Sequence, residues 1–281
     1  KVYAGRLGYP KLQDLPIEPD ASIAAWEREL LKKYCANDLH VTDGLYTSVD
    51  KQVLLRADMS KEYRVDLRSK SDAQIAEAVL RSEVEAVTDK RLRPTKYKDD
   101  QKFRYLDPKI ISFKSSDLND ILRRVLDEKF ETGANGSITM PRWLKDTKMK
   151  IGDGQYQMGV GGLHSCEKSQ SVYAGAGNVL ADFDVASYYP SIILQQGITP
   201  DNMGDVFSRV YQGIVDRRIK AKRSGDKVTA DTLKIVVNGS FGKLGSKYSA
   251  LYAPNLLIQT TLTGQFALLM LIERLEEIGV K

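Results

Sequence analysis

The stretch D-V-A-S-Y-Y-P-S-I-I, residues 184–193, places a carboxylate, a tight turn and the start of a helix within ten residues. The overlapping run V-L-A-D-F-D-V, residues 179–185, predicts a strand with Asp182 and Asp184 on one face. Pro190 suits the first turn of a helix, and Gly197 suits its end. The segment therefore predicts strand, turn and helix in succession.

This succession suits a metal-bound triphosphate. The Asp184 carboxylate can hold Mg2+, and the backbone carbonyl of Val185 can add a second oxygen ligand. Amides of the turn and of the helix N-terminus can face phosphate oxygens, because unpaired N–H groups collect there. A lone aspartate at a strand end more often caps a turn, but the complete string favours the ligand site.

Two further helices are predicted downstream, at 204–223 and 228–241, on either side of the turn S-G-D at 224–226. Such an antiparallel pair presents side chains of both helices on neighbouring turns. The first helix is expected to bury an apolar stripe formed by Val206, Val210 and Ile214.

The end of the first helix is strongly basic. The run R-R-I-K-A-K-R, residues 217–223, contains five cations, of which Arg218 and Lys222 lie four residues apart on one face. These two side chains are candidates for phosphate contacts. On charge alone, a solvated helix face explains the run equally well.

In the second helix Lys234, Asn238 and Phe241 recur at helical spacing and predict one stripe with a cation, an amide and an aromatic ring. The lysine can neutralise triphosphate charge, and the ring can pack against a base pair. Gly239 and Gly242 are expected to leave room for the close approach of a ligand.

The remaining elements follow from hydrophobic spacing and from breakers. The proline-rich segment 10–20 predicts an extended chain, and Asp20 is the expected N-cap of a helix that carries Tyr34 and Asp38 on one face. We also expect helices at 72–86, 116–130 and 256–277, the last in the core, a basic loop at 91–98 and a glycine-rich turn at 152–162.

Composition narrows the class of protein. The 281 residues carry 42 Lys and Arg against 37 Asp and Glu, a net charge of +5 that permits binding to polyanions. No run is apolar enough for a signal peptide or an obvious membrane span, so no membrane partner is expected. Two cysteines without a C-x-x-C pair predict neither a disulfide framework nor a thiolate zinc site, and favour a reducing compartment.

Two of these segments resemble motifs of family B DNA polymerases. Residues 184–193 resemble motif A, D-x-x-S-L-Y-P-S-I-I, with Tyr188 at the leucine position. K-I-V-V-N-G-S-F-G, residues 234–242, resembles motif B, K-x-x-x-N-S-x-Y-G, but Phe241 lacks the tyrosine hydroxyl. Between them, Arg218 and Lys222 match the R-x-x-x-K of the fingers helix in that family.

Weaker resemblances lie upstream in the expected order. Y-C-A-N-D, from Tyr34 to Asp38, is similar to the Y-x-x-x-D motif of the family's proofreading exonuclease. V-G-G at 160–162 is similar to the linker motif Y-x-G-G, which implies a DNA contact for Gly161 and Gly162.

The resemblance implies an α+β fold with an incomplete polymerase palm, short two-helix fingers and the end of a ribonuclease H-like exonuclease domain. It divides the chain into an exonuclease remnant at 1–49, an intermediate region at 50–150, palm with motif A at 151–203, fingers with motif B at 204–243 and a palm helix at 244–281.

The implied reaction is template-directed addition of deoxynucleoside triphosphates to a DNA 3′ end, with primer-template DNA and a two-metal Mg2+ site that this chain holds only in part. Asp184, as a catalytic residue, and the Val185 carbonyl would bind the metal at the polymerase site. Asp38 would bind metal at the exonuclease site, where Asp38 and Tyr34 would be catalytic. Tyr189 would lie beneath the sugar and reject a 2′-hydroxyl. The other implied nucleotide contacts are Ser187, Tyr188, Arg218, Lys222, Lys234, Asn238 and Phe241, and Gly242 joins the implied DNA contacts.

Parts of both catalytic sites are missing from the sequence. Neither a D-x-E before Tyr34 nor a motif C after the last helix is readable, so we expect this chain to be a piece of a longer protein and inactive alone. The short distance from Asp184 to Arg218 suggests a phage or mobile-element source and a bacterial or phage-infected cytoplasm. The alternative is a non-catalytic nucleic-acid-binding protein on a polymerase scaffold, and an isolated exonuclease fits less well because Asp38 has no visible partners.

Overall fold

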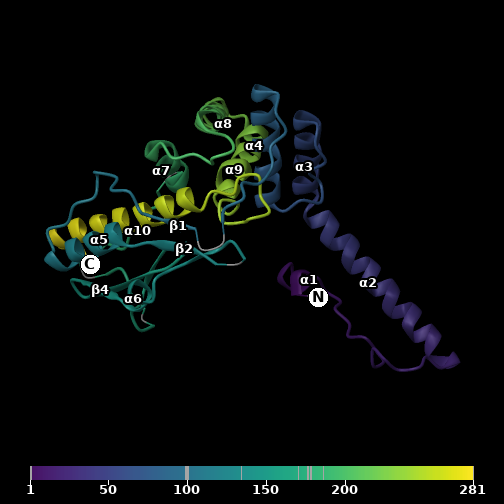
Figure 1. Cartoon of the computed structure of the whole chain (residues 1–281). Helices are drawn as coiled ribbons and strands as arrows, with labels where there is room; N and C mark the ends of the chain where they lie inside the picture. Colours follow the sequence, from purple (N-terminus) through teal and green to yellow (C-terminus); the bar gives the residue numbers. More distant parts are fainter. Residues whose placement is uncertain are drawn as a thin grey trace. The chain divides into compact units, whose positions relative to one another are not determined.

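A computed structural model describes residues 2–98, 101–133, 135–169, 171–175, 177, 179–185 and 187–280. The chain divides into two compact units, residues 1–69 and 70–281. Helices and short antiparallel strands occur together in the second unit, which confirms the α+β class at that level. Figure 1 shows the elements in chain order.

The regular elements among the described residues of the first unit are all helical. They are α1 (Val2–Arg6), a 3-10 turn η1 (Ala25–Glu27), α2 (Arg28–Ser48) and α3 (Asp50–Tyr63), and residues 7–24 between α1 and η1 form no helix or strand. The expected start of a helix at Asp20 is wrong, because the Glu27 carboxylate accepts the Ala24 backbone N–H at 2.8 Å and fixes the entry turn there. Helix α2 buries no residue.

Three helices of the second unit form one layer: α4 (Asp72–Thr88), α8 (Asp205–Ser224) and α9 (Lys227–Phe241), which lie side by side in Figure 1. Ser71 caps α4, as its hydroxyl accepts the Gln74 N–H. At the turn between α8 and α9, Gly225 adopts φ +76° and Asp226 caps α9. These ends confirm the predicted helical hairpin.

Gly239 explains how closely α9 packs against α4. A Cβ atom at this position would lie 2.6 Å from the Asp72 carbonyl oxygen and 3.0 Å from the Ala76 Cβ. The expected approach of a ligand at Gly239 is therefore wrong, since the space is taken by the first turn of α4.

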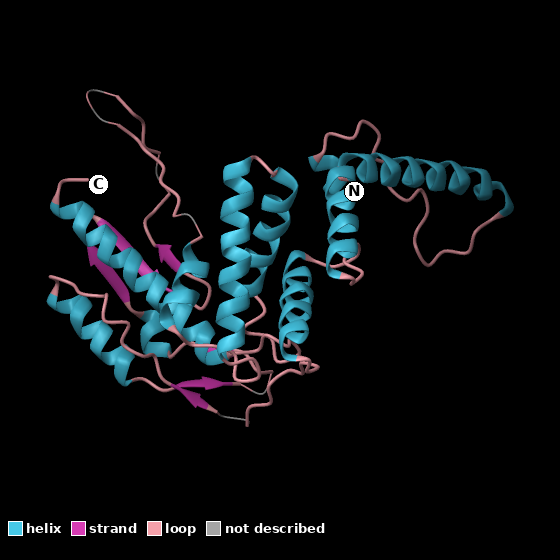
Figure 2. Ribbon diagram, turned by 90° about the horizontal axis from the view of Figure 1, so that it is seen from above, coloured by secondary structure: helices cyan, strands magenta, loops and turns pink. Residues whose placement is uncertain are grey.

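The other half of the unit is built on α10 (Pro254–Glu277). Helix α7 (Tyr188–Gln196) lies on one side of it, and α5 (Ser116–Asp127) and the strands lie on the other (Figure 1). Two antiparallel sheets, separate in Figure 2, have the strand orders β1-β2-β3 and β4-β5-β6. Their elements are β1 (Lys102–Phe103), α5 (Ser116–Asp127), β2 (Phe130–Thr132), β3 (Ile138–Thr139), α6 (Arg142–Asp146), β4 (Lys148–Ile151), β5 (Gly154–Met158), β6 (Leu163–Ser165) and α7 (Tyr188–Gln196).

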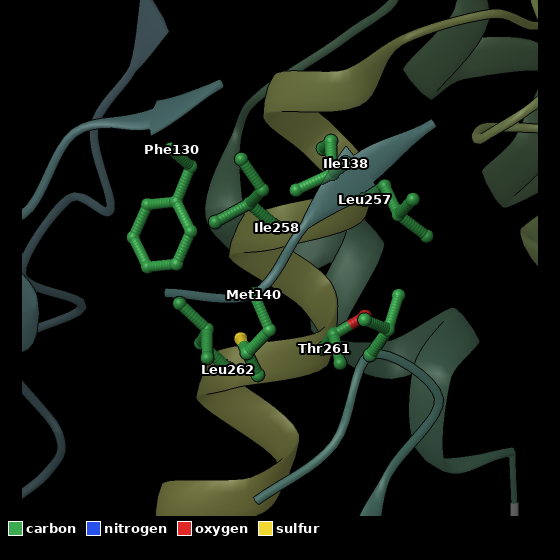
Figure 3. A pocket seen from close by; sticks show the side chains of 8 residues that line it. Phe130, Ile138, Met140, Leu257, Ile258, Thr261 and Leu262 are labelled. Atoms are coloured by element: carbon green, nitrogen blue, oxygen red, sulfur yellow. The ribbon is translucent and has the colours of Figure 1, made fainter. Parts of the chain in front are cut away.

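The core of this half is apolar around α10. Figure 3 shows Ile258 and Leu262 of α10 facing Phe130 and Ile138 of the first sheet across a small pocket. In length and composition α10 would also suit a membrane span, but here it is the central core helix. Its predicted role in the core is confirmed.

Several buried polar side chains of α10 bind backbone of other segments. Gln259 donates to the Leu106 carbonyl at 2.7 Å and accepts the Leu106 N–H at 2.9 Å. Gln265 likewise donates to the Gly159 carbonyl at 2.9 Å and accepts the Gly159 N–H at 3.0 Å. Glu273 accepts the backbone N–H groups of Lys114 and Ser115 at the start of α5. These bonds satisfy groups that burial would otherwise penalise.

Three local predictions are corrected. The described residues 179–185 form no strand, and Phe183 is 90% exposed, because an alternating sequence becomes a strand only when a neighbouring strand pairs with it. The helix expected at 116–130 ends at Asp127, where Glu128 turns extended and leads into β2. In α8 Ile214 is buried as predicted, but Val206 and Val210 are half-buried, and the other buried side chains are Phe207, Tyr211, Val215 and Ala221.

Candidate functional site

The start of α7 is joined to α8 by a side-chain hydrogen bond. Ser187 is the N-cap of α7 and has left-handed backbone angles, φ 54° and ψ 43°. Its hydroxyl accepts a hydrogen bond from Nη1 of Arg218 at 2.9 Å. A non-glycine residue in this conformation is held by its surroundings, and such positions are frequent at binding sites. The two residues expected to contact a nucleotide therefore meet in the fold.

Three aromatic rings continue this contact between motifs. Tyr189 stacks on Phe241 of α9 with ring centroids 4.3 Å apart and an interplanar angle of 24°. The Tyr188 ring also stacks on the Tyr189 ring, with ring centroids 5.8 Å apart and an interplanar angle of 23°. The stack joins the start of α7 to the end of α9, so Tyr188, Tyr189 and Phe241 form one aromatic wall.

Both tyrosine hydroxyls are anchored. The Tyr189 hydroxyl donates to the Gly161 carbonyl at 2.9 Å, which draws the glycine-rich loop to the stack. The Tyr188 hydroxyl donates to the Gly264 carbonyl of α10 at 2.6 Å. Burial raises the pKa of Tyr188 to about 12 and also raises the pKa of Tyr189, so both phenols are neutral at physiological pH.

Gly264 is a residue of this site that the sequence analysis missed. A Cβ atom there would lie 3.2 Å from the Tyr189 ring and 3.3 Å from the Tyr188 ring. The absence of a side chain at Gly264 therefore lets both rings pack closely against α10. Its signal was a glycine inside a strongly apolar helical pattern, which indicates close packing or function.

A basic groove runs along the hairpin of α8 and α9. Arg218, Lys222 and Lys234, the three cations expected to hold phosphates, line it together with Lys227. Lys222 and Lys234 are exposed, and Arg218 connects the groove to Ser187. Two carboxylates also lie in the lining, Asp226 and Asp231, and hydrogen bonds from Thr229 lower the pKa of Asp226. The remaining lining residues are Ala221, Gly225 and Ala230.

Other expected contacts lie at the margin of this site. Asn238 is exposed on α9, one turn beyond Lys234, and does not line the groove. Gly242 ends α9, and a Cβ there would meet only the Gly239 carbonyl at 3.8 Å, so protein packing does not require this glycine. A Cβ at Gly162 would approach the Tyr189 hydroxyl to 3.7 Å, which is ordinary contact.

The expected metal ligands are exposed. Asp184 and Val185 lie in the segment 179–185, and the described residues contain no cluster of three histidines, cysteines or carboxylates. One carboxylate and one carbonyl fit a single Mg2+ that completes its shell with phosphate oxygens and water. They do not fit the several shared ligands of a two-ion centre.

Tyr34 and Asp38 belong to the first unit and are described within it. Both are half-buried on α2, one turn apart as predicted, on a helix that buries no residue. Among the described residues, Asp38 does not belong to any group of three or more His, Cys, Asp or Glu side chains that could hold a metal ion. The expected exonuclease role of this pair remains a prediction.

No family model, curated protein or solved structure matches the chain.

Proposed function

We propose that the second unit binds a deoxynucleoside triphosphate at the start of α7 and along the α8–α9 groove, as part of a template-directed DNA polymerase that resembles family B. The observation that carries this proposal is the meeting of the start of α7 with α8 and α9 through the Arg218–Ser187 hydrogen bond and the Tyr189–Phe241 stack. Residues far apart in the sequence thus supply the cations and the aromatic wall that a nucleotide needs.

The groove suits the phosphates. Four cationic side chains face two carboxylates there, so the local charge favours an anion. Arg218 leads toward the first turn of α7, whose leading N–H groups lack partners within the helix. A triphosphate that extends from Lys234 past Arg218 would therefore meet positive charge along its length.

The aromatic wall suits the nucleoside. Tyr189 stacks between Tyr188 and Phe241 and is fixed by its bond to Gly161, so the position of its ring is well determined. In the proposed complex Phe241 and Asn238 lie beside the nascent base pair, and Tyr189 lies beneath the sugar. Phe241 needs no hydroxyl for this stacking role.

The metal enters with the nucleotide in this proposal. Asp184 and the Val185 carbonyl would hold Mg2+, which neutralises phosphate charge when bound. The chain's own residues then hold and orient the triphosphate. Nucleotidyl transfer to a DNA 3′ end is the reaction proposed for the protein to which this site belongs.

We expect Lys234→Ala to weaken binding of a fluorescent deoxyadenosine triphosphate in Mg2+ by roughly tenfold or more, because a charge-assisted contact is lost. Lys220→Ala is the matched control, since Lys220 is an exposed lysine on α8 that does not line the groove. Equal effects of the two substitutions in a binding titration would remove Lys234 from the site.

The same titration separates the proposal from its alternative. A chain that binds oligonucleotides while showing no affinity for triphosphates would be the non-catalytic nucleic-acid-binding protein. For the polymerase, Asp184→Asn in a protein that extends primers should abolish extension and preserve primer-template binding, because a neutral amide is a weak Mg2+ ligand. Near-normal extension by this variant would exclude Asp184.

A further inference from the structure

A second cationic pocket lies outside the α8–α9 groove. Its charged lining consists of Lys96 and Lys98 from the basic loop and Lys247 from the segment before α10. No carboxylate is among the described residues that line it. The rest of the lining is formed by Thr95, Tyr97, Thr132, Gly133, Gly136 and Tyr252.

The basic loop is held in place by the turn at 200–204. Nδ2 of Asn202 donates to the carbonyls of Arg93 and Ala250, at 2.7 and 2.9 Å. The Tyr97 hydroxyl donates to Asp201 at 2.9 Å, and burial together with this carboxylate raises the pKa of Tyr97. The loop that carries Lys96 and Lys98 is therefore tied at two points.

The opposite wall is also built by specific contacts. Gly136 has φ +78°, and a Cβ there would lie 2.7 Å from the Lys247 Cβ. The Tyr252 hydroxyl donates to the Gly136 carbonyl at 2.6 Å, and the Tyr97 ring meets the Tyr252 ring edge-on at 5.4 Å. Lys247 is thus seated against the first sheet, beside the basic loop.

Two of the lysines and one buried donor of this pocket make no contact that offsets them among the described residues. Within the described part of the chain, Lys96 and Lys98 have no carboxylate partner, and the buried Thr95 hydroxyl has no hydrogen-bond partner. Gathering like charges raises the free energy of the folded chain unless an anion offsets it. A phosphate group supplies both the charge and the acceptor oxygens.

We propose that this pocket binds a phosphodiester of a nucleic-acid backbone, through Lys96, Lys98, Lys247 and the Thr95 hydroxyl. The choice of a nucleic acid over a free phosphate compound rests on the proposed function, which assigns the triphosphate to the α8–α9 groove. The pocket is then a positioning contact for the strand and not part of the reacting centre.

The test compares two double variants of equal charge and spacing. Lys96→Gln/Lys98→Gln removes two charges from the pocket, and Lys148→Gln/Lys150→Gln removes two charges from exposed lysines of β4 that do not line this pocket. Fluorescence anisotropy of a labelled single-stranded oligonucleotide is measured across a salt series. We expect the pocket variant alone to weaken binding, and to lower the slope of log affinity against log salt by roughly 1.4.

A third variant and a second titration identify the ligand. Thr95→Val should weaken oligonucleotide binding by roughly tenfold, since it removes a hydrogen bond to a charged group while keeping the shape. Binding of the fluorescent triphosphate should be unchanged in both pocket variants, so a failure of this proposal is distinguishable from a failure of the α8–α9 site. Thermal melting checks that the variants fold.

Two outcomes would overturn the proposal. Equal losses in the pocket variant and the β4 variant would show that only overall charge matters. Competition by pyrophosphate at the pocket, with oligonucleotide binding insensitive to Lys96 and Lys98, would show that the occupant is a free phosphate compound instead.

Discussion

Two pairs of predicted site residues are in direct contact. Arg218 and Ser187, and Tyr189 and Phe241, were expected to share a ligand, and the fold brings each pair into direct contact. Their meeting could not be read from spacing, because the partners are about 30 and 50 residues apart and only the packing of α7 against α8 and α9 joins them.

Glycines illustrate the limit of residue-scale prediction. Gly239 was expected to leave room for a ligand, but the Asp72 carbonyl of α4 occupies the space beside it. Gly264 drew no functional expectation, although it seats both tyrosine rings. A sequence shows where a Cβ is missing, but what fills the space depends on tertiary packing.

Gly239→Ala should therefore destabilise the second unit by about 1 to 3 kcal/mol, because its methyl group would overlap the α4 backbone. Gly213→Ala in α8 is the control, since a Cβ there meets nothing within 4 Å. It should raise stability by about 0.5 to 1 kcal/mol through helix propensity. Urea unfolding measures both, and two changes of the same sign would contradict the packing argument.

Among elements, helices were predicted far better than strands. The bounds expected for α8, α9 and α10 agree with the structure to within two residues, because helical periodicity and capping are local signals. Strand β1 pairs with β2, which lies nearly 30 residues away, and neither strand exceeds three residues. The strands are therefore too short for an alternation of apolar and polar residues to predict them. The expected strand at 179–185 failed for the complementary reason, as alternation alone supplies no partner.

Helix α10 also contains polar residues that its apolar pattern concealed. Gln265→Leu should lower the free energy of unfolding by about 1 to 3 kcal/mol, because the half-buried Gly159 carbonyl would lose this donor and the Gly159 N–H would keep only the Gly162 carbonyl. Gln212→Leu, at an exposed position of α8, should change it by no more than about 0.5 kcal/mol. Chemical denaturation of both variants checks this, and equal effects would show that the Gly159 bonds are dispensable.

At the scale of the whole molecule, stability should depend on alkaline pH. Burial raises the pKa of Tyr105 and Tyr211 above the ordinary value, and that of Tyr188 to about 12. Below about pH 10 these phenols are neutral in the folded and unfolded chain, so their contribution is fully present. As pH rises further, the unfolded chain releases protons that the folded chain retains, and stability falls.

The midpoint of thermal unfolding should thus decline between about pH 10 and pH 12. Tyr105→Phe should reduce the steepness of this decline, whereas Tyr248→Phe should leave it unchanged because Tyr248 is 82% exposed. A decline that is identical in the parent chain and in Tyr105→Phe would assign it to other groups.

The tight seat of Gly239 against α4 has a mechanical consequence. Helices α4, α8 and α9 pack as one layer, and Arg217 of α8 also pairs with Glu83 of α4, so a tilt of the hairpin would disturb its contacts with α4. The basic loop 91–98 follows directly after α4. Through α4, this layer therefore links the α8–α9 groove to the loop that lines the second cationic pocket. If either proposed ligand changes the packing of the layer and thereby the affinity for the other ligand, the effect must be equal in both directions.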